Sequence, residues 1–92
     1  MTEAFEATIT GRVQAVSLRE YTRRKAESLN IVGSIQNLKD GTVRVYAEGN
    51  KRNLERLIEF LHQGSPDARV ENIAYTWVTP KGSCNTFSII YS

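Results

Sequence analysis

The sequence predicts an α+β sandwich, in which two helices pack on one face of a single sheet. Two observations favour this fold class. Strand-like and helix-like segments follow one another in the order strand, helix, strand, strand, helix, strand, with one more strand at the end. The chain of 92 residues is long enough for one hydrophobic core but not for two, so residues 1–92 are expected to form a single domain.

The first strand is predicted over residues 4–12, where apolar and polar side chains alternate. Gly11 ends the regular alternation and opens a loop of small residues that leads into a helix. The first N–H groups of a helix have no partners inside it, so such a junction is a ready anion site. Arg19 lies in the first turn and adds a planar, permanently charged group beside that site. Phosphate is the anion that fits this combination.

The first helix is expected from Ser17 to about Leu29. Ser17 and Glu20 have the spacing of a capping box, in which each side chain bonds the backbone N–H of the other residue. The side chains expected on the inward side of this helix are Leu18, Tyr21, Thr22, Ala26 and Leu29.

A β-hairpin is predicted after this helix. Asn30 suits a left-handed stop, and residues 31–38 have strand-like alternation, with Gly33, Ile35 and Asn37 on one face. Asp40-Gly41 is typical of a tight turn, and a third strand follows at 42–48. In this strand one face is expected to hold Val43, Val45 and Ala47, and the other Thr42, Arg44, Tyr46 and Glu48.

The second helix is expected to begin after Asn50, which suits an N-cap, and to end at Gly64 and Pro66. Its apolar residues recur at the spacing of one helix face, at Leu54, Leu57, Ile58 and Leu61. Two further strands are predicted, over residues 70–79 and 87–91. Three aromatic residues are expected to be sheet and core residues: Tyr75, Trp77 and Tyr91.

This element order corresponds to two split βαβ halves, which form a ferredoxin-like α/β sandwich. The sheet would be mixed and mostly antiparallel, with a C-terminal strand added. Right-handed crossovers place both helices on the same face of the sheet. The loop before the first helix then lies at one edge of the layer, open to solvent.

Composition limits the possible partners and compartments. The net charge of +2 is too small to favour non-specific nucleic-acid binding, and the single cysteine fits a reducing compartment. The sequence has neither a signal-peptide pattern nor an apolar stretch of membrane-spanning length. His62 and Cys84 are remote from the loop and offer neither a metal site nor a nucleophile–base pair. We expect a cytoplasmic monomer without metal, membrane partner or nucleic acid.

Two spaced motifs resemble the signatures of the acylphosphatase family. The segment Gly11-x-Val13-Gln14-x-Val16-Ser17-x-Arg19 resembles the first signature, which usually reads G-x-V-Q-G-V-x-[aromatic]-R. The second comprises Gly33-Ser34-Ile35-Gln36-Asn37, then Asp40-Gly41-Thr42-Val43 and Gly49. The resemblance extends over essentially the whole chain, to the closing Phe87-Ser88-Ile89.

The resemblance implies hydrolysis of small acyl phosphates, the mixed anhydrides of carboxylic and phosphoric acids, to carboxylate and inorganic phosphate. It implies no metal and no cofactor. In the family, the arginine matching Arg19 holds the phosphate and the asparagine matching Asn37 positions the attacking water. The backbone amides implied to complete the phosphate cradle are those of Val13, Gln14, Ala15, Val16, Ser17 and Leu18.

The chemistry of these residue types agrees with the implied roles. A carboxylate is a good leaving group, so positioning and charge stabilisation can do most of the work. Arg19 can bind two phosphate oxygens at once. Asn37 can accept from and donate to a water, but its amide is too weak a base to deprotonate that water. The phosphate of the substrate is then the expected proton acceptor.

The sequence departs from the family pattern at three positions. Ala15 replaces a glycine, Leu18 replaces an aromatic residue, and Ser34 stands where a bulky residue is frequent. If residue 15 needs a positive φ, alanine costs about 1–2 kcal/mol of strain. About 1.4 kcal/mol in transition-state binding is tenfold in rate. Leu18 is expected to alter only packing and Ser34 only the surface, so reduced activity is compatible with the sequence and loss of activity is not implied.

Several alternatives stay open. The chain is also compatible with a phosphate-binding domain without efficient turnover, or with an acyl- or carbamoyl-phosphate-processing domain of a larger enzyme, which the position of the chain ends disfavours. Tyr46 and Trp77 suggest a base-stacking platform, but residues 42–48 lack the aromatic-rich signature of RNA-binding domains. Gln14 is expected either only to bond the loop to itself or to have a role beyond its N–H.

Overall fold

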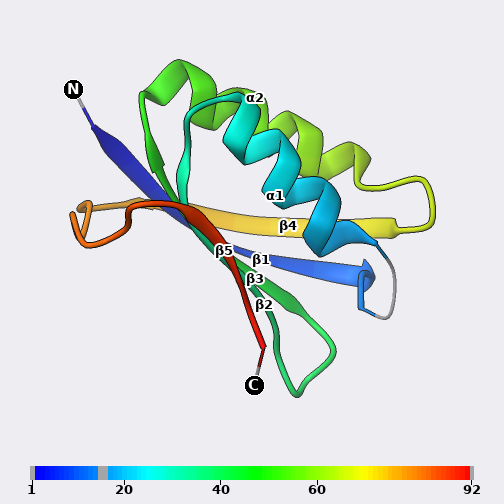
Figure 1. Ribbon diagram of the computed structural model, residues 1–92. Helices are drawn as coiled ribbons and strands as arrows, with labels where there is room; N and C mark the ends of the chain where they lie inside the picture. The colour runs from blue at the N-terminus through cyan, green and yellow to red at the C-terminus, as the bar shows by residue number, and fades with distance from the viewer. Residues whose placement is uncertain (1, 15–16, 92) are drawn as a thin grey trace.

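The computed structural model describes residues 2–14 and 17–91. Its elements are β1 (Glu3–Arg12), α1 (Leu18–Ser28), β2 (Val32–Asn37), β3 (Val43–Gly49), α2 (Lys51–Gln63), β4 (Arg69–Val78) and β5 (Phe87–Ile90). The strands form one sheet in the order β4-β1-β3-β2-β5, and both helices lie on one face of it (Figure 1). The predicted ferredoxin-like sandwich is confirmed, with slightly shifted element ends. Ala15 and Val16 lie outside the described residues.

The sheet is mixed and mostly antiparallel, as predicted. β1 pairs antiparallel with β3 and β4, and β2 pairs antiparallel with β3. β5 runs parallel to β2, with Ile35 opposite Ile89 and Gln36 opposite Ile90. The last strand therefore runs alongside the strand that ends at Asn37.

The hydrophobic core lies between the sheet and the two helices. The predicted apolar face of α2 is buried, at Leu54, Leu57, Ile58 and Leu61. The inward face of β3 is also the predicted one, at Val43, Val45 and Ala47. Fully burying one such aliphatic side chain stabilises the fold by about 1.5–3 kcal/mol. The two periodicities in the sequence therefore identify the core-facing residues.

The predicted residues at the helix ends are also confirmed, at the start of α2 and after both helices. Asn50 caps α2, since its side chain accepts a hydrogen bond from the Asn53 N–H at 2.8 Å. Gly64 follows α2 with φ of +70°, and Asn30 follows α1 with φ of +57°.

Gly11 shapes the end of β1. Its φ is +133°, and the pairing of β1 with β4 shifts register between Thr10 and Gly11. A Cβ at this position would lie 2.2 Å from the carbonyl oxygen of Arg69. Only glycine allows this close approach, and the irregularity ends the regular strand just before the loop.

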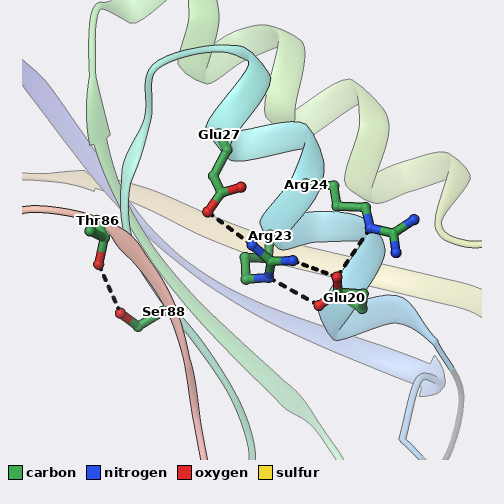
Figure 2. Close-up of polar contacts among 6 residues, drawn as sticks. All are labelled: Glu20, Arg23, Arg24, Glu27, Thr86 and Ser88. Atoms are coloured by element: carbon green, nitrogen blue, oxygen red, sulfur yellow. Dashed lines mark hydrogen bonds and ion pairs between the residues drawn. The ribbon is translucent and has the colours of Figure 1, made fainter.

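The start of α1 differs from the predicted capping box. Ser17 occupies the N-cap position, but its side chain makes no hydrogen bond to the helix. Figure 2 shows that Glu20 instead binds Arg23 and Arg24, each one turn further along the helix. These hydrogen bonds, that of Arg23 above all, lower the pKa of Glu20 to about 2. A charged guanidinium is a stronger partner for this carboxylate than a backbone N–H, so the capping-box prediction is wrong.

The prediction that several aromatic residues belong to the core is also wrong. Tyr75 is 44% exposed, Trp77 is 40% exposed, and Tyr91 is 76% exposed; Tyr21 on α1 is exposed as well. Tyr75 and Trp77 lie on β4, an edge strand, where their rings pack edge-on against Phe5 of the core and against each other but keep an exposed side. A strand pattern gives the face of a side chain but not the distance of the strand from the sheet centre.

Candidate active site

The loop between β1 and α1 is anchored in the core at both ends. Val13 and Leu18 are almost completely buried, so their side chains fix the points where the loop leaves β1 and enters α1. The end of β1 and the start of α1, which flank the loop, lie at one edge of the layer (Figure 1). Leu18 occupies an inward position of α1, which agrees with the expectation that this departure affects packing.

Gln14 connects this loop to the turn between β2 and β3. Its Nε2 donates hydrogen bonds to the carbonyl oxygens of Leu38 at 2.6 Å and Thr42 at 2.8 Å. Of the two expectations for Gln14, a bond only within the loop is wrong, because the side chain bonds the turn between β2 and β3. The side chain holds the loop next to the residue that follows Asn37. A single amide can do this because its two hydrogens diverge toward two carbonyls.

Asn37 is the last residue of β2 and lies opposite Val43 of β3. Its Oδ1 is buried and accepts no hydrogen bond from the residues that the structure describes. A buried acceptor without a donor costs about 1–3 kcal/mol. The Asn37 amide therefore has an oxygen available to a donor from outside the chain, such as a water.

Arg19 lies in the first turn of α1 and differs from the other arginines of that helix. Arg23 and Arg24 are paired with Glu20 and Glu27 (Figure 2). Within the described residues no carboxylate pairs with Arg19. Its guanidinium instead lies over the ring of Tyr91, with Cζ 5.1 Å from the ring centroid. The donors of Arg19 are therefore not committed to a carboxylate of the residues that the structure describes.

Ser17 is held by a residue that the sequence reasoning missed. Its N–H donates to Asp67 Oδ2 at 3.0 Å and its Oγ donates to Asp67 Oδ1 at 2.7 Å, and Ser65 Oγ donates to the same Oδ1 at 2.8 Å. These bonds, first that of the Ser17 hydroxyl, lower the pKa of Asp67. The Ser17 N–H is thus already partnered in this structure, and Asp67 fastens the α2–β4 connection to the start of α1.

The other residues that the sequence analysis discussed as possible site residues lie away from the loop. Ser34 faces Tyr46 across the β2–β3 pair, on the sheet face opposite the helices, and His62 is in the last turn of α2. Tyr46 and Trp77 lie opposite Glu6 and Phe5 of β1, respectively. Successive side chains of a strand point to opposite faces, so the two aromatic rings share no face and form no common stacking platform.

Among residues 2–14 and 17–91, no three His, Cys, Asp or Glu side chains group in a way that could hold a metal ion. In the same part of the chain, no helix is both long enough and apolar enough to cross a membrane.

The fold and the loop together define a small α+β protein with an uncommitted arginine at the start of its first helix. The family model for acylphosphatase matches residues 5–89. The chain belongs to the acylphosphatase family, and it is an enzyme of the class that hydrolyses acyl phosphates.

Individual relatives agree with this assignment. The acylphosphatase of Salinibacter ruber is 49% identical over 71 residues, which cover 77% of this chain and 75% of the relative. The crystal structure of acylphosphatase from Bacillus subtilis superposes with a TM-score of 0.92 at 31% identity, covering 99% of this chain and 100% of the other. The fold also matches part of a longer protein, HypF of T. kodakarensis, with a TM-score of 0.84, 30% identity and 98% of this chain covered, but only 12% of HypF.

Proposed function

We propose that this chain hydrolyses small acyl phosphates by direct attack of a water on phosphorus, with Arg19 as the phosphate anchor and Asn37 as the residue that holds the water. The observation that carries this proposal is the contact of Arg19 with Tyr91, a residue next to the strand that pairs with β2. Arg19 lies over Tyr91, and Tyr91 directly follows Ile90, which pairs with Gln36, the neighbour of Asn37. This chain of neighbours supports a position of the guanidinium near the amide, at the end of the β2–β5 pair.

In the proposed reaction, the Asn37 Oδ1 accepts a hydrogen bond from the attacking water. This bond orients a lone pair of the water oxygen toward phosphorus. A new bond forms between the water oxygen and phosphorus, and the bond between phosphorus and the acyl oxygen breaks. The electron pair of that bond leaves on the carboxylate. The proton of the water passes to a phosphate oxygen, because the amide of Asn37 cannot take it.

Arg19 supports the same reaction electrostatically. Its planar donors can bind two equatorial oxygens of the phosphate, on which charge is spread in the transition state. The backbone amides proposed to complete the cradle belong to Val13, Gln14, Ala15, Val16, Ser17 and Leu18. The N–H of Ser17 contributes only if it leaves Asp67, with which it is paired here.

The test of this proposal is hydrolysis of an aromatic acyl phosphate, with and without a chelator. We expect turnover that the chelator leaves unchanged, a lower kcat in Asn37→Ala, and both a higher KM and a lower kcat in Arg19→Ala. Circular dichroism of both variants controls for folding. If either folded variant retained the parent rate, its assigned role would be abandoned.

We also propose that the chain acts as a single-domain cytoplasmic monomer whose partners are the acyl phosphate and the product phosphate. The small net charge of +2 and the single cysteine support this proposal. Size-exclusion chromatography with light scattering tests the oligomeric state. Salt-dependent binding to a single-stranded oligonucleotide would contradict the absence of a nucleic-acid partner.

A further inference from the structure

We propose that Tyr91 is a positioning residue of the active site, because its ring is the platform that holds the guanidinium of Arg19 beside Asn37. This inference rests on the proposed role of Arg19 as phosphate anchor. It adds a residue that lies outside both motifs of the sequence and that sequence reasoning assigned to the core.

The first argument is the contact itself. The Cζ of Arg19 lies 5.1 Å from the centroid of the Tyr91 ring, within the range of about 6 Å over which a ring face attracts a cation. In the described part of the chain, no carboxylate holds Arg19. The ring is therefore the one group recorded there that fixes the direction of this long side chain.

The second argument is the register of the two strands. β2 and β5 are parallel, with Ile35 opposite Ile89 and Gln36 opposite Ile90. Asn37 is the last residue of β2, and Tyr91 directly follows the last residue of β5. Side chains alternate between faces, so Asn37 lies on the face of Ile35, where α1 packs on both strands, and the same alternation continued one residue beyond β5 places Tyr91 on that face. The contact of the ring with Arg19 agrees with this placement on the helix side of the sheet.

The third argument concerns competition for the donors of Arg19. A carboxylate partner would occupy guanidinium N–H groups, as Glu20 and Glu27 occupy those of Arg23. A ring face attracts the flat side of the guanidinium. The N–H groups, which lie in the plane of the guanidinium, then stay free for phosphate oxygens. Stacking on Tyr91 therefore holds the anchor in place without competing with the substrate.

The experiment compares Tyr91→Leu with Tyr91→Phe, because only phenylalanine keeps an aromatic face. Since cation–π attraction at an exposed site is worth a factor of roughly two to five in an equilibrium constant, we expect Tyr91→Leu to raise KM and the inhibition constant of inorganic phosphate by about that factor. Tyr91→Phe should behave as the parent. Tyr75→Leu, a change at a half-exposed tyrosine on β4, is the matched control and should change neither constant.

A spectroscopic readout separates positioning from general structure. The ring current of Tyr91 should shift the side-chain proton resonances of Arg19 upfield, and this shift should persist in Tyr91→Phe and disappear in Tyr91→Leu. The double variant Arg19→Ala with Tyr91→Leu should bind phosphate no more weakly than Arg19→Ala alone. Additive effects would overturn the inference.

The outcomes also separate this inference from the proposed function. Loss of phosphate binding in Arg19→Ala with parent-like constants in Tyr91→Leu would overturn the role of Tyr91 and leave that of Arg19 intact. A parent-like Arg19→Ala would overturn the anchor, and with it the positioning role. Weaker phosphate binding in both Arg19→Ala and Tyr91→Leu, together with parent-like binding in Tyr91→Phe, supports the anchor role of Arg19 and the positioning role of Tyr91.

Discussion

Gln14 Nε2 donates a 2.6 Å hydrogen bond to the carbonyl oxygen of Leu38, across 24 residues of sequence. This contact joins the loop before α1 to the residue directly after Asn37. The two halves of the proposed site come from different segments of the chain, and their relative position is what direct attack of a held water requires. A side chain from the first motif thus sets the geometry of the second.

The first prediction concerns this contact. Gln14→Glu replaces the donating amide by a carboxylate that cannot donate to the carbonyls of Leu38 and Thr42. We expect kcat to fall about tenfold, the effect of about 1.4 kcal/mol in the transition state. Loss of donors to partly buried carbonyls should lower the free energy of unfolding by about 1–3 kcal/mol. Steady-state kinetics and urea titration measure the two effects.

The matched control for this prediction is Gln63→Glu, the same change at an exposed residue at the end of α2. It should leave both kcat and stability as in the parent. Equal effects of the two substitutions would contradict a specific role for the Gln14 amide.

The second prediction concerns Tyr46 and Glu48 on the face of the sheet away from the helices. Glu48 is only 4% exposed and accepts from the Tyr46 hydroxyl and, at 3.0 Å, from the Gly82 N–H. Tyr46→Phe removes one of these donors from a buried carboxylate. We expect a loss of about 1–3 kcal/mol in unfolding free energy with unchanged KM and kcat.

The expected separation of stability from activity follows from position. Tyr46 lies opposite Ser34 and Glu48 opposite Val32, whereas Asn37 lies opposite Val43 at the other end of the strand pair. The Tyr46 hydrogen bond lowers the pKa of Glu48. Its contribution is therefore complete above the unfolded value of about 4.3 and is lost as pH falls through the lower folded value. Equal stability of parent and variant at pH 7 would refute this account.

The third prediction concerns the contact between Asp67 and Ser17. Asp67→Asn keeps the size of the side chain but removes the charge that accepts three hydrogen bonds from Ser17 and Ser65. We expect a lower urea midpoint at pH 7. Because folding lowers the pKa of Asp67, the difference between parent and variant should be complete above about pH 4 and shrink as pH falls through the folded pKa. A difference that stays constant down to pH 2 would argue against an ionic contribution.

The local spacing of apolar residues was sufficient to predict the strands, the helices and the core-facing residues. Buried side chains recur every second residue in a strand and every three to four residues in a helix. Leu57 and Val45 were identified in this way. The wrong predictions depend on competing partners, some of them near in sequence, as Arg23 is for Glu20, and some far away. Ser17 has capping-box spacing, yet its partner Asp67 is 50 residues away. Trp77 has a core-like residue type, but the strand order places it at the edge of the sheet.

In the candidate site, too, the sequence predicts some features and not others. Arg19 and Asn37 come from motif resemblance, and their roles remain proposals. The contacts that would hold them, from Tyr91 and Gln14, depend on which strands and turns become neighbours. No spacing rule in the sequence predicts that the last strand lies beside β2, and so none predicts the ring under Arg19.

The last prediction concerns Ala15, where the family usually has glycine. If the loop needs a positive φ at this position, a Cβ costs about 1–2 kcal/mol, and its removal should favour the transition state of the reaction. We expect Ala15→Gly to raise kcat/KM by up to about tenfold. Ala15→Ser, which keeps the Cβ, is the matched control and should show no such gain.

The stability of Ala15→Gly tests the same strain. A glycine adds freedom to the unfolded chain and so lowers the free energy of unfolding, and an unchanged free energy of unfolding would therefore show that strain was relieved. Unchanged kinetics together with reduced stability in Ala15→Gly would show that alanine is unstrained there and that the departure from the family pattern has no cost to catalysis.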